Sequence, residues 1–189
     1  MLPNGAEAMI VLRRAMPDDA QGIADVHVAS WRTTYPGMVP DHVLTGLSVH
    51  RLTSVYRRMI RSGGVVHVAV DSLPEHVEIA EAGRRVIGFV TARRTQTLLA
   101  DSEIETLYLL DDYCNRGYGR LLVQAAAGDL AAKGTKSLAV WVLSANPSRW
   151  FYARLGGRLA ADDTILVGGV ETRRTAFVWN PISRLVGLS

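Results

Sequence analysis

The stretch from Glu103 to Leu122 reads E-I-E-T-L-Y-L-L-D-D-Y-C-N-R-G-Y-G-R-L-L and decides the fold of the chain. Its first part alternates polar and apolar residues through Thr106 and is then uniformly apolar, which predicts a strand whose two halves face different surroundings. The residues from Cys114 to Arg120 follow this strand and open a helix, so their backbone amides can converge on an anion. Gly117 and Gly119 let the chain approach a phosphate closely. An ordinary strand-to-helix turn without a ligand fits the same residues equally well.

Two known phosphate-binding signatures do not fit this turn. Leu122 stands where the dinucleotide-binding fingerprint has its third glycine, and no G-K-[ST] sequence follows, as a P-loop would require. The turn alone therefore predicts an anion site without naming the anion.

Working outward, the patterns predict a mixed α/β chain. Strands are expected at 9–14, 65–70, 85–92, 103–110 and 137–143, and a hairpin at 158–179 with its turn at Gly168 and Gly169. Helices are expected after Pro17, at 40–47, around 52–60, after the glycine turn, and at 148–155. This order lacks the regular alternation of a doubly wound sheet. We expect residues 1–8 to form a short flexible leader and residues 9–189 to form a single domain.

Composition excludes several other classes of protein. The chain has 189 residues, is 48% hydrophobic and 21% charged, and carries a net charge of +3, which is ordinary globular usage. Its one cysteine excludes an intrachain disulfide framework and a cysteine-rich zinc site, and its five histidines show no metal-ligand spacing. The arginine pairs are scattered without interleaved aromatics, which disfavours nucleic acid as a partner. No membrane span or signal peptide is evident, so we expect a cytoplasmic protein.

A second block narrows the function. Trp141 to Arg158 reads W-V-L-S-A-N-P-S-R-W-F-Y-A-R-L-G-G-R. This block and the 103–122 stretch, in this order and separation, closely resemble two successive motifs of the GNAT superfamily of N-acetyltransferases, the first being its acyl-CoA-binding signature Q/R-x-x-G-x-G/A. The opening segment and the closing hairpin are also similar to bacterial members. The resemblance implies a mostly antiparallel sheet of about seven strands, splayed between the fourth and fifth and flanked by helices.

The resemblance also implies acetyl-CoA as the cofactor. The backbone of Leu107, Tyr108 and Leu109 would pair with the pantetheine, and the Leu109 amide would polarise the thioester carbonyl. Asn146 matches a pantetheine-contacting asparagine, and Arg154 matches a basic position near the phosphates. The turn that would hold the diphosphate comprises Cys114, Asn115, Arg116, Gly117, Tyr118, Gly119 and Arg120.

One residue of that turn departs from the family pattern. Cys114 stands where the signature has glutamine or arginine. A thiol supplies neither a charge nor an amide, so we expect affinity for acetyl-CoA to rest on the backbone, Arg116 and Arg120, and to be lowered.

Acyl transfer to an amine needs a base for the ammonium proton and an acid for the departing thiolate. Tyr152 matches the family tyrosine near the cofactor sulfur, and we assign it as the acid, the alternative being a core aromatic. Glu103 is the first choice for the base and Glu105 the second; two apart on a strand, they share a face that leads toward Leu107. Alternatively, both are solvated and bulk water is the base.

Trp31 and Tyr35, expected in the loop after the first helix, are candidates for substrate contact, although packing explains Trp31 equally well. His27 lies on the apolar stripe of that helix and is expected to pack in the core.

The leading hypothesis is a metal-independent enzyme that transfers acetyl from acetyl-CoA to a primary amine, most simply of a small molecule, by direct attack in a ternary complex. Cys114 would lie far from the thioester, which disfavours a covalent intermediate. Two alternatives stay open: an acyl-CoA-binding module without catalysis, and a protein or peptide N-acetyltransferase, which a flat open acceptor cleft would favour. The superfamily often dimerises, so a homodimer is also compatible with the sequence.

Overall fold

The computed structural model describes residues 9–72 and 84–187. The expected leader at 1–8 and most of the expected loop between the second and third strands lie outside the described residues. Within them, the strands form one mixed sheet in the order β1-β2-β3-β4-β5-β7-β6. The strands are β1 (Met9–Arg14), β2 (Val65–Ser72), β3 (Arg84–Arg94), β4 (Ser102–Leu109), β5 (Leu138–Leu143), β6 (Arg158–Val167) and β7 (Val170–Trp179).

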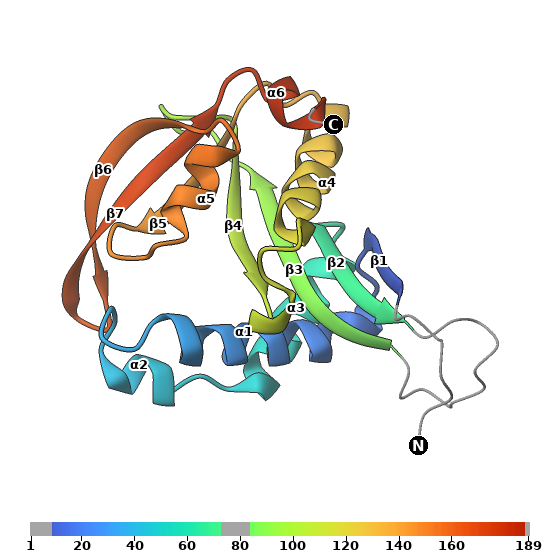
Figure 1. Cartoon of the computed structure of the whole chain (residues 1–189), viewed down its shortest axis with the longest axis vertical. Helices are drawn as coiled ribbons and strands as arrows, with labels where there is room; N and C mark the ends of the chain where they lie inside the picture. The colour runs from blue at the N-terminus through green and yellow to red at the C-terminus, as the bar shows by residue number, and fades with distance from the viewer. Residues whose placement is uncertain (1–8, 73–83, 188–189) are drawn as a thin grey trace.

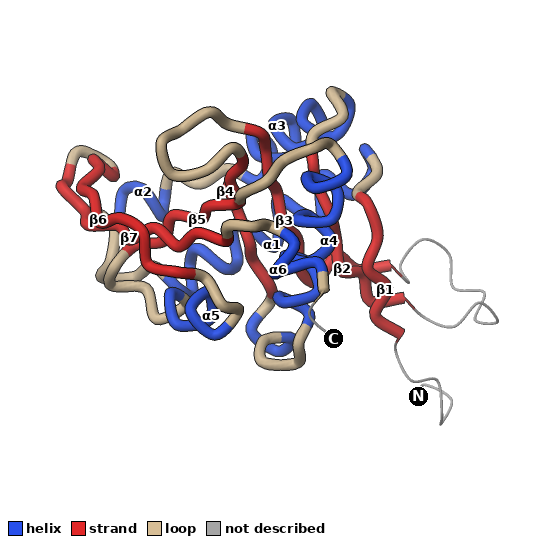
Figure 2. Tube along the Cα trace, turned by 90° about the horizontal axis from the view of Figure 1, so that it is seen from above, coloured by secondary structure: helices blue, strands red, loops and turns tan. Residues whose placement is uncertain are grey.

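All neighbouring strands are antiparallel except β4 and β5, which are parallel. Figure 2 shows the strands as one continuous twisted layer from β1 to β6 with helices on both sides. This arrangement confirms the expected fold: a mixed α/β domain with a mostly antiparallel sheet.

Helices cover the two faces of the sheet. On one face, α1 (Ala20–Thr34) and α3 (Val49–Arg61) pack on the valines of β2 and on Phe89 of β3. On the other, α4 (Tyr118–Ala132) and α6 (Ser183–Val186) enclose the larger core with β3, β4, β5 and β7. The short helices α2 (Asp41–Thr45) and α5 (Arg149–Arg154) lie beside the half of the sheet formed by β5, β6 and β7 (Figure 1). No helix in the described ranges is long and apolar enough to cross a membrane.

The sheet opens between β4 and β5. These strands pair only at Glu103 with Ala139 and at Ile104 with Val140. β4 continues to Leu109 and β5 to Leu143, so the two strands diverge over most of their length (Figure 1). The expected splay between the fourth and fifth strands is therefore present.

A β-bulge determines which side chains of β4 face the opening. The register between β3 and β4 shifts so that Thr91 pairs with Thr106 but Ala92 pairs with Ile104, which leaves Glu105 as an extra residue. Because of this extra residue, Ile104 and Leu107 both pack in the core on the α4 side, three positions apart. Simple alternation would have placed Leu107 on the face of Glu103 and Glu105, so the expectation that this acidic face leads toward Leu107 is wrong.

Candidate active site

A cavity of about 830 Å³ occupies the opening between β4 and β5. It brings together all the site residues expected from the sequence except Arg116 and Tyr118, which do not line it. The Arg116 guanidinium instead lies over the ring of Tyr113, 5.8 Å from its centroid. Tyr118 begins α4 and packs against the main core.

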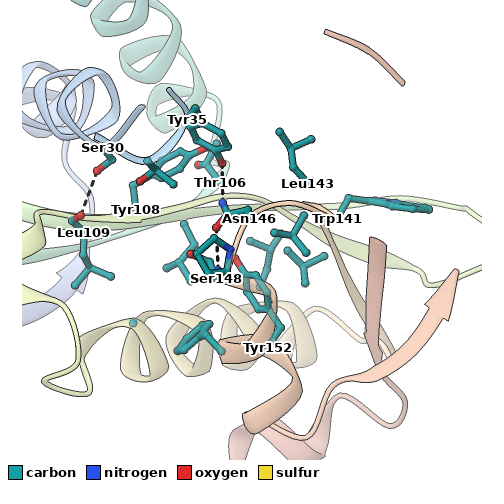
Figure 3. Close-up of a pocket in the computed structure, with 18 of the residues that line it drawn as sticks. Ser30, Tyr35, Thr106, Tyr108, Leu109, Trp141, Leu143, Asn146, Ser148 and Tyr152 are labelled. Atoms are coloured by element: carbon teal, nitrogen blue, oxygen red, sulfur yellow. Dashed lines mark hydrogen bonds between the residues drawn. The ribbon is translucent and has the colours of Figure 1, made fainter. Parts of the chain in front are cut away.

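Beyond Ile104, the backbone of β4 is not paired with β5 and borders this cavity. The Leu110 N–H donates to the Ile87 carbonyl at 2.9 Å, which sets the alternation along the antiparallel pair. The backbone groups of Leu107 and Leu109 therefore point away from β3, toward the side where β5 has diverged. Ser30 Oγ confirms this direction, because it donates to the Leu109 carbonyl at 3.1 Å (Figure 3).

Ser30 was not among the residues expected at the site. It lies on α1, is 4% exposed and lines the cavity. Its only signal in the sequence is a small polar residue on a helix face that is otherwise apolar. Other lining residues that were not anticipated are Thr34, Val39, Thr106, Trp141, Leu143, Ser148, Phe151, Ile165, Val167 and Arg174.

The turn before α4 has the conformation of an anion-binding loop. Asn115 and Gly117 both adopt left-handed backbone angles, with φ of 60° and 88°, and Gly117 is the N-cap of α4. Gly119 follows in the first turn, and a Cβ added there would lie 3.4 Å from Leu109 and Phe151, both of which line the cavity. The turn thus places backbone amides at a helix N-terminus beside the open strand.

Two carboxylates lie at the opposite end of the cavity. Glu103 and Glu105 share one partner, Arg93 of β3, at 3.6 Å and 2.9 Å. The expectation that they lie on one face is confirmed by this shared contact. Burial raises the pKa of Glu105 and the repulsion of Glu103 adds to it, while the attraction of Arg93 acts against both.

Tyr152 lies on the other face of the sheet. It is 7% exposed and packs in the main core against Phe177 and Trp179. Its ring is therefore a core aromatic, as the alternative interpretation of the sequence predicted. It also lines the cavity, on the side of the ribbons opposite Tyr35 and Tyr108 (Figure 3). Burial raises the pKa of Tyr152 well above its ordinary value, so the phenol keeps its proton throughout the neutral range.

Aromatic side chains form the wall between these two ends. Trp31 donates from Nε1 to the Tyr108 hydroxyl at 2.9 Å, and its ring contacts the tilted ring of Tyr35 at 4.7 Å between centroids. Trp31 lies in the last turn of α1 rather than in the following loop, because the helix continues to Thr34. His27 packs in this cluster as expected, and burial lowers its pKa to about 4.

Asn146 joins two walls of the cavity. Its Oδ1 accepts from the Ser148 N–H at 2.8 Å, and its Nδ2 donates to the Tyr35 hydroxyl at 3.5 Å (Figure 3). The side chain is 3% exposed, so it is held between the segment after β5 and the end of α1.

A contact between α2 and the β6–β7 turn closes the cavity on the acidic side. Val43 of α2 packs with Val167 of β6 and Leu143 of β5 in one apolar cluster. A Cβ added at Gly168 in the turn would overlap Val43 and lie 2.8 Å from His42 Nε2. The tip of the hairpin therefore rests on α2 and forms an arch over the site (Figure 1).

Cys114 lines the phosphate end of the cavity and is exposed. Burial of its sulfur and the nearby Asp111 raise the pKa of the thiol, which disfavours a thiolate nucleophile. Across residues 9–72 and 84–187, no group of three or more His, Cys, Asp or Glu side chains could hold a metal ion.

Comparison with known proteins identifies the family. The chain is 32% identical over 179 residues to the uncharacterized N-acetyltransferase YuaI of Bacillus subtilis (strain 168), with 94% of this chain and 96% of that protein covered. The chain belongs to the GNAT superfamily of N-acetyltransferases. The model of the FR47-like protein family matches residues 85–167, which include β4, the phosphate turn and α5 of this GNAT protein.

Solved structures agree with this GNAT fold. The putative acetyltransferase yncA of Salmonella typhimurium, solved with acetyl-CoA, has a TM-score of 0.66 at 16% identity and covers 92% of this chain and 94% of its own. A GNAT superfamily phosphinothricin acetyltransferase of Sinorhizobium meliloti, in complex with acetyl-CoA, has a TM-score of 0.64 at 20% identity, covering 91% and 88%. At these identities, the likeness concerns the fold.

Proposed function

We propose that this protein transfers an acetyl group from acetyl-CoA to the primary amine of a small molecule by direct attack in a ternary complex. One observation carries the proposal: the cavity between β4 and β5 joins Glu105 on one face of the sheet to Tyr152 on the other. A base and an acid are thereby placed on opposite sides of a single reaction space.

The residues around the opening suit acetyl-CoA, which supplies an acetyl group activated as a thioester. Leu107 and Leu109 offer backbone groups to an extended chain such as pantetheine. The turn from Cys114 to Arg120 offers amides in left-handed geometry to a diphosphate, and Arg120 and Arg154 line the same end of the cavity. Gly119 leaves this end of the cavity free of a side chain between Leu109 and Phe151.

On the acceptor side, Glu105 takes the proton that the ammonium must lose. Glu105 lies with Glu103 on the acceptor face, and its raised pKa brings the carboxylate closer to the range where a base works best at neutral pH. Glu103 lies where β4 and β5 are still paired, farther from the opening. These observations support Glu105 over Glu103, the reverse of the preference from the sequence.

On the opposite face, Tyr152 gives its proton to the departing thiolate as the new C–N bond replaces the C–S bond. A tyrosine phenol is protonated at neutral pH, so this proton is present when the thiolate departs. The Leu109 N–H, directed into the cavity, stabilises negative charge that develops on the carbonyl oxygen. A preorganised donor in this role typically lowers the barrier by a few kcal/mol.

The arch favours a small acceptor over a protein. The contact between α2 and the hairpin tip lies beside the acidic side of the cavity, so a chain approaching from that side would have to separate Val43 from the turn at Gly168. A flat open cleft, which a protein substrate would favour, is absent from this side of the described structure.

The test is a screen of amines with labelled acetyl-CoA, read by product label and by release of free thiol. We expect at least one small primary amine to be acetylated, and Glu105→Gln to lower kcat by about 100-fold or more, with CoA affinity unchanged by calorimetry. Glu103→Gln, on the same strand and bound to the same arginine, is the matched control and should lose much less activity.

The opposite outcomes are equally clear. CoA binding without transfer to any amine of a broad panel would favour the binding-module alternative. A larger loss in Glu103→Gln than in Glu105→Gln would return the role of base to Glu103.

A further inference from the structure

Arg174 is the one cationic residue of the β6–β7 hairpin that lines the cavity, among the residues that the structure describes. Its Cα is paired with Leu143 of β5, and its guanidinium lies over the ring of Trp141, 4.1 Å from the centroid. The side chain therefore leans from β7 back over β5, toward the opening.

Arg174 lies on the same face of the sheet as the two carboxylates. Val140 and Val142 pack in the core on the α4 side, so Trp141 and Leu143 face the other way, and Arg174 faces with Leu143. Ile104 pairs with Val140 and points to the α4 side, so its neighbour Glu103 points to the opposite face, where Trp141 lies. Glu105 lies on this same face, because it shares its partner Arg93 with Glu103.

The guanidinium of Arg174 uses only part of its hydrogen-bonding capacity within the described residues. Asp163 accepts from Nη2 at 2.8 Å. Nε is buried and has no hydrogen-bond partner among the described residues. An unpaired buried donor destabilises the folded protein, so an anion that accepts a hydrogen bond from the Arg174 guanidinium would remove this penalty. A planar guanidinium matches a carboxylate best.

The two groups suit the two ends of a bifunctional molecule. β4 and β7 lie on either side of β5, so Glu105 and Arg174 approach Trp141 from opposite sides on one face of the sheet. An amino acid that lies across Trp141 would present its amine to one of them and its carboxylate to the other. Trp141 lies between them as an apolar floor.

We propose that the acceptor is a free amino acid, whose amine lies at Glu105 and whose carboxylate is bound by Arg174 above Trp141. This inference rests on the proposed function and narrows it to one class of substrate.

The experiment compares each standard amino acid with its α-carboxamide in the free-thiol assay, using wild type and Arg174→Gln. We expect at least one amino acid to be preferred over its carboxamide by about tenfold or more in kcat/KM, since a hydrogen bond to a charged group is lost in the carboxamide. In Arg174→Gln, this preference should fall to near unity through a higher KM for the acid. The carboxamide's kcat/KM should fall much less than that of the acid, and an unchanged CoA affinity by calorimetry shows that the variant is folded.

Arg173→Gln is the matched control, because Arg173 is the exposed neighbour on β7 whose side chain points to the other face. It should keep the wild-type preference. A carboxamide acetylated as well as its acid by wild type, or a preference that survives Arg174→Gln, would overturn the inference while leaving the acetyltransferase intact. Transfer to neither compound, nor to any other amine, would instead contradict the proposed function.

Discussion

At the scale of single residues, Arg93 sets the charge balance of the acceptor end. It contacts both carboxylates, and its own side chain is 56% exposed, so its influence on their pKa values is partly screened by water. Glu105 experiences burial and Glu103, which raise its pKa, against Arg93, which lowers it. Because Arg93 and Glu103 act on this pKa in opposite directions, the pH dependence of the reaction in variants of these two residues tests whether Glu105 is the base.

Replacing Arg93 and replacing Glu103 should move the acidic limb of the pH–activity profile in opposite directions. A base must be deprotonated, so kcat/KM should rise as pH increases through the pKa of Glu105. Arg93→Met removes the attraction, raises this pKa and should move the limb to higher pH by about one unit or less. Glu103→Gln removes the repulsion and should move it to lower pH. Profiles of kcat/KM against pH check both; two variants with unshifted limbs would show that Glu105 is not the base.

Cys114 gives a second prediction at this scale. Its neutral thiol bonds only weakly, at 3.7 Å from Sγ to the Leu110 carbonyl, so little is lost on replacing it. Cys114→Gln should preserve or tighten acetyl-CoA binding, as measured by calorimetry, because it restores the amide of the family signature. A large loss of affinity would reveal a role for the thiol beyond its place in the turn.

At the scale of elements, the sequence patterns predicted most helices and strands well, and the errors have local causes. The helical spacing of Leu52, Val55, Tyr56, Met59 and Ile60 predicts that they form the buried face of α3. However, Val55 is 51% exposed and Thr53 is buried instead. Thr53 tolerates burial because its hydroxyl donates to the Val49 carbonyl within the helix, at 2.9 Å. Helical periodicity is based on side-chain polarity alone, so it does not predict that a threonine can be buried with its hydroxyl bonded inside the helix.

Helix α4 carries the phosphate turn at one end, and its stability can be tested without touching that end. Gly128 lies inside α4, and a Cβ there would meet nothing within 4 Å. Gly128→Ala should raise the free energy of unfolding by about 0.5–1 kcal/mol, because alanine loses less backbone freedom in a helix. Gly134→Ala, equally uncrowded but at φ 82° after the same helix, should lower it by about 1 kcal/mol. Thermal or urea unfolding measures both, and equal effects would contradict the explanation.

At the scale of the whole molecule, the arch joins segments far apart in the chain. Val43 of α2 meets Val167 at the end of β6, across a site whose other walls come from α1, β4 and β5. The turn that reaches α2 has two glycines, both at positive φ, as a two-residue hairpin loop requires. The closed acceptor site therefore depends on one small apolar contact.

The two glycines of that turn form a matched pair for testing the arch. Alanine at either position is destabilised by the left-handed backbone conformation. Only at Gly168 would the added Cβ also clash with α2, because at Gly169 it would meet nothing within 4 Å. Gly168→Ala should raise KM for the amine several-fold over Gly169→Ala, with equal CoA affinity in both. If the two variants had the same KM, the arch would not shape the acceptor site.

The sequence by itself determined the order of most strands and helices along the chain and the candidate anion-binding turn, because alternation, helical periodicity and glycine positions are local properties of the chain. The splay between the fourth and fifth strands was implied by the resemblance to the GNAT superfamily. The site residues named from the sequence make up nearly half of those that line the cavity. Only the tertiary structure decided the rest. The bulge at Glu105 depends on how β3 and β4 align, so a strict two-residue period placed Glu105 with Glu103 correctly but could not place Leu107 on the opposite face. The roles of Ser30 and Arg174 arise from contacts between residues distant in the chain, Ser30 with Leu109 and Arg174 with Trp141, which no local pattern records.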